Sequence, residues 1–231
     1  VTGAVQNIRA VGEYLAGHRS LFLVDAAQSL GVYPINVEQC HIDMLAFTGH
    51  KFLFSMQGIG GLYINPTLTL TPLIHGGTGV LSEQLLQPNI RPFIYEAGTP
   101  NIPGIVSLNA GIKNIYKNAY ATLNKKIEFL RAQLTPINNI IFHSPSNSTL
   151  LSFTLPDIDI EDFDCLLKDG FNIHARIGLH CAPLIHSYLN TPKGTIRLSP
   201  SIFTSEDDMN YTCDAIKKIV TNLANAYENS L

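Results

Sequence analysis

Lys51 is the side chain whose surroundings most directly suggest covalent chemistry. It closes the string Thr48-Gly49-His50-Lys51, which follows the apolar run 42–47 and precedes the glycine-rich string 57–61. A lysine amine at the end of a buried strand can form a Schiff base with a carbonyl cofactor, and glycines let a ligand approach the backbone closely. The alternative is a surface lysine in a turn, and this string alone leaves both interpretations open.

Asp25 follows the apolar run 21–24 and precedes Lys51 by enough chain to return to the next position in a sheet. A carboxylate facing a pyridine nitrogen keeps that nitrogen protonated and makes the ring an electron sink. Gln28 could donate to an oxygen on the same ring. Alternatively, Asp25 only caps the turn at Ala26-Ala27, a common use of aspartate.

Cys181 is the candidate nucleophile. It lies in the string Arg176-Ile177-Gly178-Leu179-His180-Cys181-Ala182-Pro183. A thiolate beside His180 and near Arg176 would have a cationic setting that favours its charged form. The alternative is an inert buried cysteine, the usual fate of a free thiol. No such setting surrounds the other three cysteines, Cys40, Cys165 and Cys213.

The four cysteines are scattered without a CxxC pair, which argues against a disulfide framework and a structural zinc site. A reducing cytosol suits such thiols, so we expect a cytoplasmic protein. We predict no metal site, because four further histidines lack ligand spacing and are interpreted as structural or incidental. These are His75, His143, His174 and His186.

Composition excludes several classes of protein. The 231 residues carry a net charge of −3, which makes nucleic acid an unlikely partner. No apolar run approaches the ~18 residues that a membrane-spanning helix needs, so we expect no membrane segment. The chain is 45% hydrophobic and only 14% charged, which indicates a globular protein with much buried surface, part of it in a subunit interface.

The apolar pattern predicts an α/β sheet in the first part of the chain. Helical spacing over 5–15 precedes three strand-like runs at 21–24, 42–47 and 60–64. Ligands of open α/β sheets bind at the carboxyl ends of the strands, where Asp25 and the Thr48–Lys51 string are expected.

Residues 72–104 are rich in glycine and proline, and long loops of this kind are usually functional. Residues 105–135 have helical spacing that ends before Pro136. The remainder predicts an α+β domain, with strands near 140–142, 150–155 and 194–198, a helix at 160–168, and a last helix capped by Ser205.

Four separated strings resemble signature segments of the class V aminotransferase family, in its branch of cysteine desulfurases and selenocysteine lyases, which use pyridoxal phosphate. They are Val24-Asp25-Ala26-Ala27-Gln28-Ser29, Thr48-Gly49-His50-Lys51, Glu96-Ala97-Gly98-Thr99-Pro100-Asn101 and Arg176-Ile177-Gly178-Leu179-His180-Cys181-Ala182-Pro183. They occur in the right order, and four matches are far more specific than one.

The resemblance implies the aspartate aminotransferase-like fold. Residues 1–104 would form the C-terminal part of the large cofactor-binding domain, 105–135 connecting helices, and 136–231 the small α+β domain. The chain begins at what resembles the point after the family's substrate-contacting asparagine. We therefore expect a fragment that lacks the N-terminal part and binds the cofactor poorly by itself.

The resemblance also implies roles for individual residues. Lys51 would carry pyridoxal 5'-phosphate, Asp25 would pair with its ring nitrogen, and Gln28 would contact the ring hydroxyl. Thr48 and His50 would hold its phosphate. Gly77, in the loop Gly76-Gly77-Thr78-Gly79, and Thr99 would reach the phosphate of a neighbouring subunit in a homodimer.

Arg197 would bind the substrate carboxylate, because its planar fork matches two oxygens at once; an ordinary surface arginine is the alternative.

The activity implied is that of a cysteine desulfurase. Cys181 would take sulfur from L-cysteine, leaving L-alanine and an enzyme-bound persulfide for an acceptor protein. Alternatives within the same fold are a selenocysteine lyase acting on selenocysteine or a class V aminotransferase. A different kind of alternative is a non-catalytic truncated product or interaction module.

Overall fold

The computed structural model describes residues 1–77, 79, 81, 83–115 and 117–228. The chain divides into two compact units. One comprises residues 7–117, and the other comprises residues 1–6 together with 118–231. The two units are described separately below.

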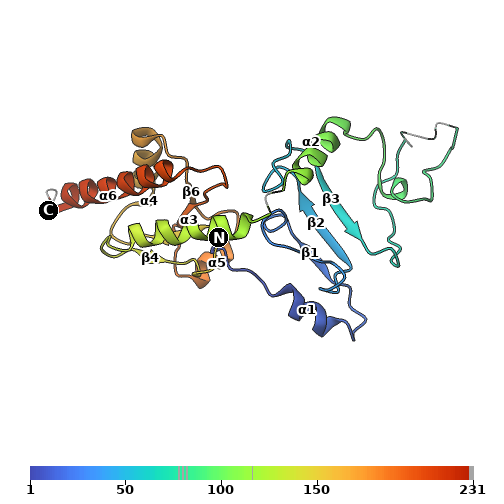
Figure 1. Ribbon diagram of the computed structural model, residues 1–231, viewed down its shortest axis with the longest axis horizontal. Helices are drawn as coiled ribbons and strands as arrows, with labels where there is room; N and C mark the ends of the chain where they lie inside the picture. Colours follow the sequence, from blue (N-terminus) through green and yellow to red (C-terminus); the bar gives the residue numbers. More distant parts are fainter. Residues whose placement is uncertain (78, 80, 82, 116, 229–231) are drawn as a thin grey trace. The chain divides into compact units, whose positions relative to one another are not determined.

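The unit of residues 7–117 is built on a three-stranded sheet in the order β1-β2-β3 (Figure 1). β1 (Leu23–Asp25) pairs in parallel with β2 (Met44–Thr48), which pairs antiparallel with β3 (Gly60–Ile64). The three predicted strands are therefore confirmed, with boundaries shifted by up to two residues. The loop that follows β3 contains one short 3-10 helix, η1 (Phe93–Tyr95).

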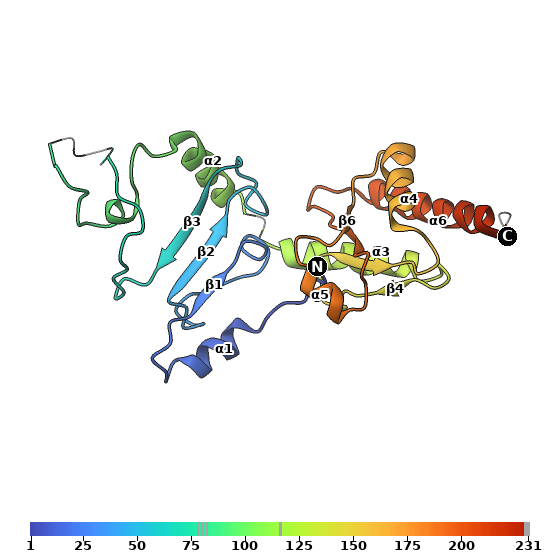
Figure 2. The same cartoon turned by 180° about the vertical axis from the view of Figure 1, so that it is seen from behind.

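Two helices pack against this sheet. α1 (Ile8–Leu15) begins at Asn7, whose side chain accepts a hydrogen bond from Ala10 N, so the helix is shorter than the predicted 5–15. α2 (Ile102–Lys113) lies beside the carboxyl end of β2, as the views from both sides show (Figures 1 and 2). A Cβ on Gly111 would collide with the carbonyl of Leu53, so only glycine allows α2 to approach so closely.

The second unit holds a four-stranded antiparallel sheet in the order β4-β5-β7-β6. Its strands are β4 (Ile141–Phe142), β5 (Leu151–Thr154), β6 (Arg176–Gly178) and β7 (Thr195–Leu198). Its helices are α3 (Ala119–Leu134), α4 (Ile160–Cys165), the π-helical turn η2 (Leu166–Gly170), α5 (Pro183–Tyr188) and α6 (Glu206–Glu228). The sequence pattern did not predict β6 or α5.

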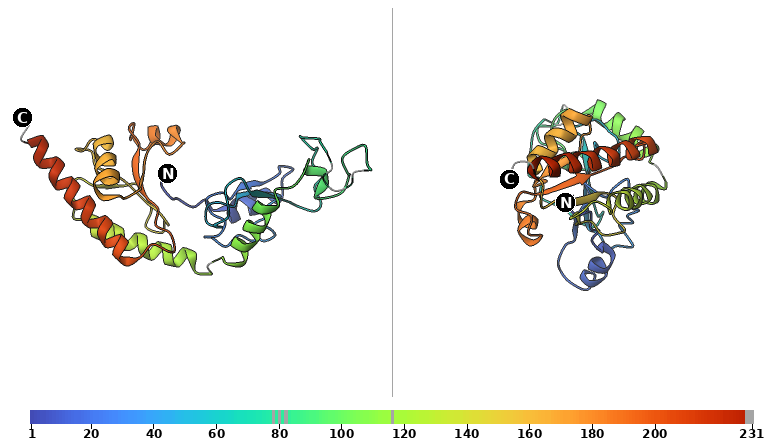
Figure 3. Two further views of the ribbon diagram at one scale, coloured as in Figure 1. Left: turned by 90° about the horizontal axis from the view of Figure 1, so that it is seen from above. Right: turned by 90° about the vertical axis from the view of Figure 1, so that its left-hand side faces the viewer.

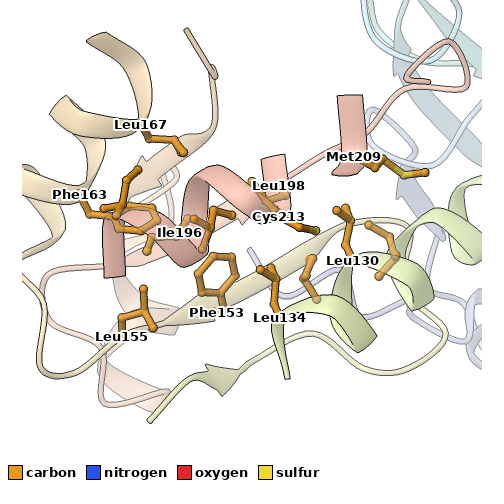
Figure 4. Close-up of a cluster of buried hydrophobic side chains, with 14 residues drawn as sticks. Leu130, Leu134, Phe153, Leu155, Phe163, Leu167, Ile196, Leu198, Met209 and Cys213 are labelled. Carbon is orange, nitrogen blue, oxygen red and sulfur yellow. The ribbon is translucent and has the colours of Figure 1, made fainter. Parts of the chain in front are cut away.

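The core of the second unit lies between its sheet and its helices. α3 and α6 lie side by side (Figure 3), and Ile127, Leu134 and Ile216 are fully buried. Figure 4 shows Phe153 and Ile196 of the sheet among side chains from α3, α4 and α6. These apolar contacts are the main source of the unit's stability.

α6 begins as predicted at Ser205. The Ser205 hydroxyl accepts from Asp208 N at 3.0 Å, and the Asp208 carboxylate accepts from Ser205 N at 2.9 Å. This reciprocal pair is a capping box. Residues 105–135, predicted to connect two domains, form α2 and α3; the division falls between them, and the domain boundaries of the complete protein stay a prediction.

None of the helices within the described residues is both long and apolar enough to cross a membrane.

The Lys126 ammonium ties α3 to the loop after β7. It donates to the carbonyl oxygens of Ser201 at 2.9 Å, Ile202 at 2.9 Å and Thr204 at 2.6 Å. We expect Lys126→Met to lower the free energy of unfolding by about 2 kcal/mol, because the loop carbonyls lose a charged donor. Urea denaturation measures this. Lys125→Met, one residue away on the exposed side of α3, is the matched control; equal losses in both variants would contradict the contact's importance.

Candidate active site

The carboxyl ends of β1 and β2 bring the first group of predicted site residues to one sheet edge. The strands are parallel, and Asp25, the last residue of β1, is in register with Ala46, two residues before the end of β2 at Thr48. Lys51 follows three residues later. The strand pattern predicted this common edge, and the structure confirms it.

Asp25 caps a turn with one carboxylate oxygen and leaves the other available to a ligand. Its Oδ1 accepts from Ala27 N at 2.9 Å, which is the structural role considered above. The side chain is exposed, and the part of the chain that the structure describes offers no partner to Oδ2. The cap fixes the direction of the carboxylate, so the two roles are compatible. Gln28 lies exposed in the same turn.

Lys51 sits in a tight turn that Gly49 makes possible. Gly49 N donates to Ile59 O at 2.9 Å, and Ser55 N donates to Gly49 O at 3.0 Å. A Cβ on Gly49 would approach both Ser55 and Ile59 to 3.0 Å, closer than normal packing allows. Lys51 is partly buried, and its ammonium has no hydrogen bond or ion pair with any described residue.

Thr48 and His50 contact each other at the same edge. The Thr48 hydroxyl lies 2.8 Å from His50 Nδ1. Together with Asp25 and Lys51 they present a carboxylate, an amine, a hydroxyl and an imidazole. This donor set suits a phosphorylated aromatic aldehyde: the carboxylate pairs with a protonated ring nitrogen, the amine with the aldehyde, and the others with the phosphate.

Gly77 and Thr99 lie on two loops that contact each other. Gly98 N donates to Gly77 O at 2.6 Å, and a Cβ on Gly79 would lie 2.5 Å from the carbonyl oxygen of Gly98. Both predicted residues are exposed, and Thr78 is outside the described residues. Within those residues, no hydrogen bond joins this pair of loops to Asp25, Thr48 or Lys51.

Cys181 lies in the other unit, on the turn after β6. Arg176 Nη2 donates to Cys181 Sγ at 2.9 Å, and the thiol is exposed. The guanidinium is thus the charged group in direct contact with this sulfur. Cys165 is the second exposed cysteine, and Cys40 and Cys213 are buried.

His180 does not supply the positive charge that the sequence suggested. Burial first, and then the charge of Arg197, lower its pKa to about 4, so it is neutral near pH 7. Its Nε2 lies 3.0 Å from Thr195 O, and a carbonyl only accepts, so Nε2 carries the hydrogen. The cationic setting of Cys181 therefore comes from Arg176.

Arg197 lies within β7, directly opposite Arg176 of β6. Burial, and after it the charge of Arg176, lower the pKa of the Arg197 guanidinium. Its Nε is buried without a hydrogen-bond partner among the described residues. Two guanidiniums side by side form a site for an anion such as a carboxylate.

The sequence did not reveal the buried polar residues behind Cys181. His186, Thr191 and Thr195 are buried and hydrogen-bonded around its turn. No spacing marks them, because short elements bring them together. The described residues contain no group of three or more histidine, cysteine or acidic side chains placed to hold a metal ion.

Comparisons with known proteins point to one family. The family model described as Aminotransferase class-V matches residues 1–211. A "Probable cysteine desulfurase" of Pyrococcus abyssi is 32% identical over 96% of this chain and 57% of its own length. One of Haemophilus influenzae is 31% identical over 94% of this chain and 52% of its own. The chain thus spans just over half the length of these relatives.

Solved structures agree. The cysteine desulfurase CsdA of Escherichia coli matches with a TM-score of 0.88 and 26% identity, over 96% of this chain and 57% of that one. A cysteine desulfurase of Thermococcus onnurineus matches with a TM-score of 0.86 and 29% identity, over the same shares of the two chains. The predicted fold, that of pyridoxal phosphate-dependent transferases, is confirmed.

His180 makes stability sensitive to acid. Its pKa is about 4 when folded and near 6.5 when unfolded, so only the unfolded chain takes up its proton between these values. Stability present above pH 6.5 is therefore lost as the pH falls toward 4. We expect His180→Gln, which keeps a donor for Thr195, to flatten this part of the stability profile, measured by urea denaturation. His174→Gln, at an exposed histidine, should keep the full slope; equal slopes in both variants would contradict the assignment.

Proposed function

Because the chain belongs to the class-V aminotransferase family, we propose that the complete protein is a pyridoxal 5'-phosphate-dependent cysteine desulfurase. The reaction converts L-cysteine and the Cys181 thiol into L-alanine and a persulfide on Cys181. The observation that carries this proposal is the 2.9 Å contact between Arg176 and an exposed cysteine thiol. An aminotransferase needs no such nucleophile, whereas sulfur transfer requires one.

The residues at the β1-β2 edge suit the cofactor. Lys51 would bind its aldehyde covalently, Asp25 would hold the proton of the ring nitrogen, and Gln28 would donate to the ring hydroxyl. Thr48 and His50 would hold the phosphate. When bound, pyridoxal phosphate supplies an electron sink that stabilises negative charge at the α-carbon of the substrate. Lys51 would then move the α-proton, as a general base and afterwards as an acid.

Cys181 would perform the sulfur transfer. Its thiolate forms an S–S bond with the substrate sulfur while the Cβ–S bond of the substrate breaks. The electron pair of the broken bond stays with the carbon fragment, which takes up a proton and leaves as alanine. Arg176 would hold the attacking sulfur through its hydrogen bond, and Arg197 would bind the substrate carboxylate through its planar fork.

The partners follow from the same chemistry. The persulfide on Cys181 needs an acceptor, which we propose is a protein thiol. Gly77 and Thr99, on loops that expose backbone and hydroxyl donors, would reach the phosphate in a second copy of the chain, which supports a homodimer. The four cysteines are free thiols, and this supports a cytoplasmic location.

Replacement of Cys181 tests the function. In the complete protein, Cys181→Ala should abolish alanine and sulfide formation from cysteine while the absorbance of the bound cofactor remains. Lys51→Ala should remove that absorbance without unfolding the protein. Cys165→Ala, at the other exposed cysteine, is the matched control and should retain activity. Continued desulfurase turnover in Cys181→Ala would rule out the proposed nucleophile.

Assays with selenocysteine and with keto acids distinguish a cysteine desulfurase from a selenocysteine lyase and from an aminotransferase.

Asp25→Asn separates the two roles of this side chain. Asparagine retains an oxygen that accepts from Ala27 N, so the turn should persist, but the charge is lost. We expect the pKa of the cofactor's ring nitrogen to fall by about one to three units, with turnover reduced at least about tenfold. Absorbance titration and steady-state kinetics measure the two effects. Unchanged values of both would show that Asp25 serves only as a cap.

A further inference from the structure

We propose that His186 is a positioning residue that fixes the turn carrying Cys181 by donating a hydrogen bond to the carbonyl of Leu179. The inference rests on the proposed function, since it takes Cys181 as the nucleophile. The sequence treated His186 as structural or incidental; its contacts give it a more specific task.

The turn that carries Cys181 has an unusual backbone. Ala182 N donates to Leu179 O at 2.9 Å, which closes a four-residue turn with His180 and Cys181 at its centre. Both central residues have positive φ, 53° for His180 and 61° for Cys181. Turns of this kind usually place asparagine and glycine there. For other residues the left-handed conformation costs about 1–3 kcal/mol each, so surrounding contacts must hold the turn in shape.

His186 supplies such a contact from the buried side. It lies in α5 and is 1% exposed. Its Nε2 is 3.1 Å from Leu179 O, and its Nδ1 is 2.9 Å from the Thr191 hydroxyl. Because a carbonyl only accepts, Nε2 carries the hydrogen and Nδ1 accepts from Thr191. The Leu179 carbonyl therefore receives two hydrogen bonds, one from the turn itself and one from His186.

The shape of the turn decides where the thiol lies. Arg176 is anchored in β6 by its pairing with β7, so its guanidinium starts from a fixed backbone. Cys181 reaches it at 2.9 Å only in the left-handed conformation observed. If the turn relaxed to negative φ, the Cα–Cβ bond of Cys181 would point elsewhere and the contact would break. His186 thus acts on the thiol through the backbone.

Two substitutions separate positioning from simple packing. The side-chain amide nitrogen of glutamine occupies roughly the place of histidine Nε2, so His186→Gln retains the bond to Leu179. The shorter amide of asparagine lies near the place of Nδ1, so His186→Asn keeps a partner for Thr191 and loses the bond to Leu179. Both variants remove the ring, and a role confined to filling space predicts similar behaviour from the two.

The labelling experiment uses the protein's own cysteines as references. Iodoacetamide is added to the complete protein, and the labelling rate of each cysteine is followed by mass spectrometry. Cys181 reports the thiol that Arg176 contacts. Cys165 is exposed, and among the described residues its thiol contacts the Asp169 carboxylate at 3.5 Å and no arginine, so it corrects for reagent and pH. Cys213 is buried in the core of the same unit and becomes labelled only when that unit unfolds.

We expect the labelling of Cys181 relative to Cys165 to fall about tenfold in His186→Asn, because the sulfur loses its contact with the Arg176 guanidinium, and to stay near the wild-type ratio in His186→Gln. Alanine formation from cysteine should fall in parallel in the asparagine variant, in kcat rather than KM. Equal ratios in wild type and both variants, with Cys213 protected, would overturn the proposal. Equal losses in both variants would also overturn it, since glutamine should rescue.

If Cys213 becomes labelled in His186→Asn, a second pair decides. Thr191→Val removes the hydroxyl that holds the imidazole, and Thr191→Ser retains it. A reduced Cys181 ratio in the valine variant alone supports the proposal, and an unchanged ratio overturns it. The proposed function is tested separately. Turnover in Cys181→Ala would refute Cys181 as the nucleophile, whatever the labelling shows. If Cys181→Ala is inactive but the labelling of Cys181 is unchanged in every variant, only the role of His186 is refuted.

Discussion

The parallel pairing of β1 with β2 is the constraint on which the group of polar residues at this sheet edge depends. Parallel neighbours end at the same edge of a sheet, and here that edge receives the Asp25 carboxylate from β1 and the turn with Lys51 from β2. A slip of one residue would turn every β2 side chain to the other face. The register is protected by Val24 and Leu45, which are in register with each other and buried in the same apolar cluster.

The position of the Cys181 thiol depends on a strained backbone turn as well as on strand register. The antiparallel pairing of β6 with β7 places Arg176 opposite Arg197, but the thiol reaches Arg176 through a left-handed turn that neither strand specifies. Thr195 and His186 hold that turn through His180 and Leu179. Residues in sparsely populated backbone regions gather at functional sites because the surrounding structure can compensate their cost.

The sequence predicted the sheet edge with Asp25 and Lys51 better than the turn with Cys181, for a physical reason. Runs such as 42–47 are apolar and long enough to show a strand period, so the sheet edge with Lys51 follows from local pattern. β6 has three residues and α5 has six, and both are formed by tertiary contacts that a local pattern does not contain. The positive φ of Cys181 has no local signal, because cysteine does not favour that conformation. The contact between His186 and Leu179 has none either, because it forms only once the turn and α5 have folded together. The four family-like strings predicted the candidate site residues, while the geometry of those residues came from the fold.

The pairing of Arg176 with Arg197 places two positive charges side by side, which costs the folded unit electrostatic free energy. Like charges on neighbouring strands repel, and burial together with the charge of Arg176 lowers the pKa of Arg197. Within the described residues, no carboxylate pairs with Arg176 or Arg197 in a salt bridge. The Cys181 sulfur accepts a hydrogen bond from Arg176, whereas the buried Nε of Arg197 has no hydrogen-bond partner among the described residues. An anion bound between the two guanidiniums would reduce this repulsion, so the same electrostatic cost that the paired arginines impose on folding would favour a negatively charged ligand over a neutral one.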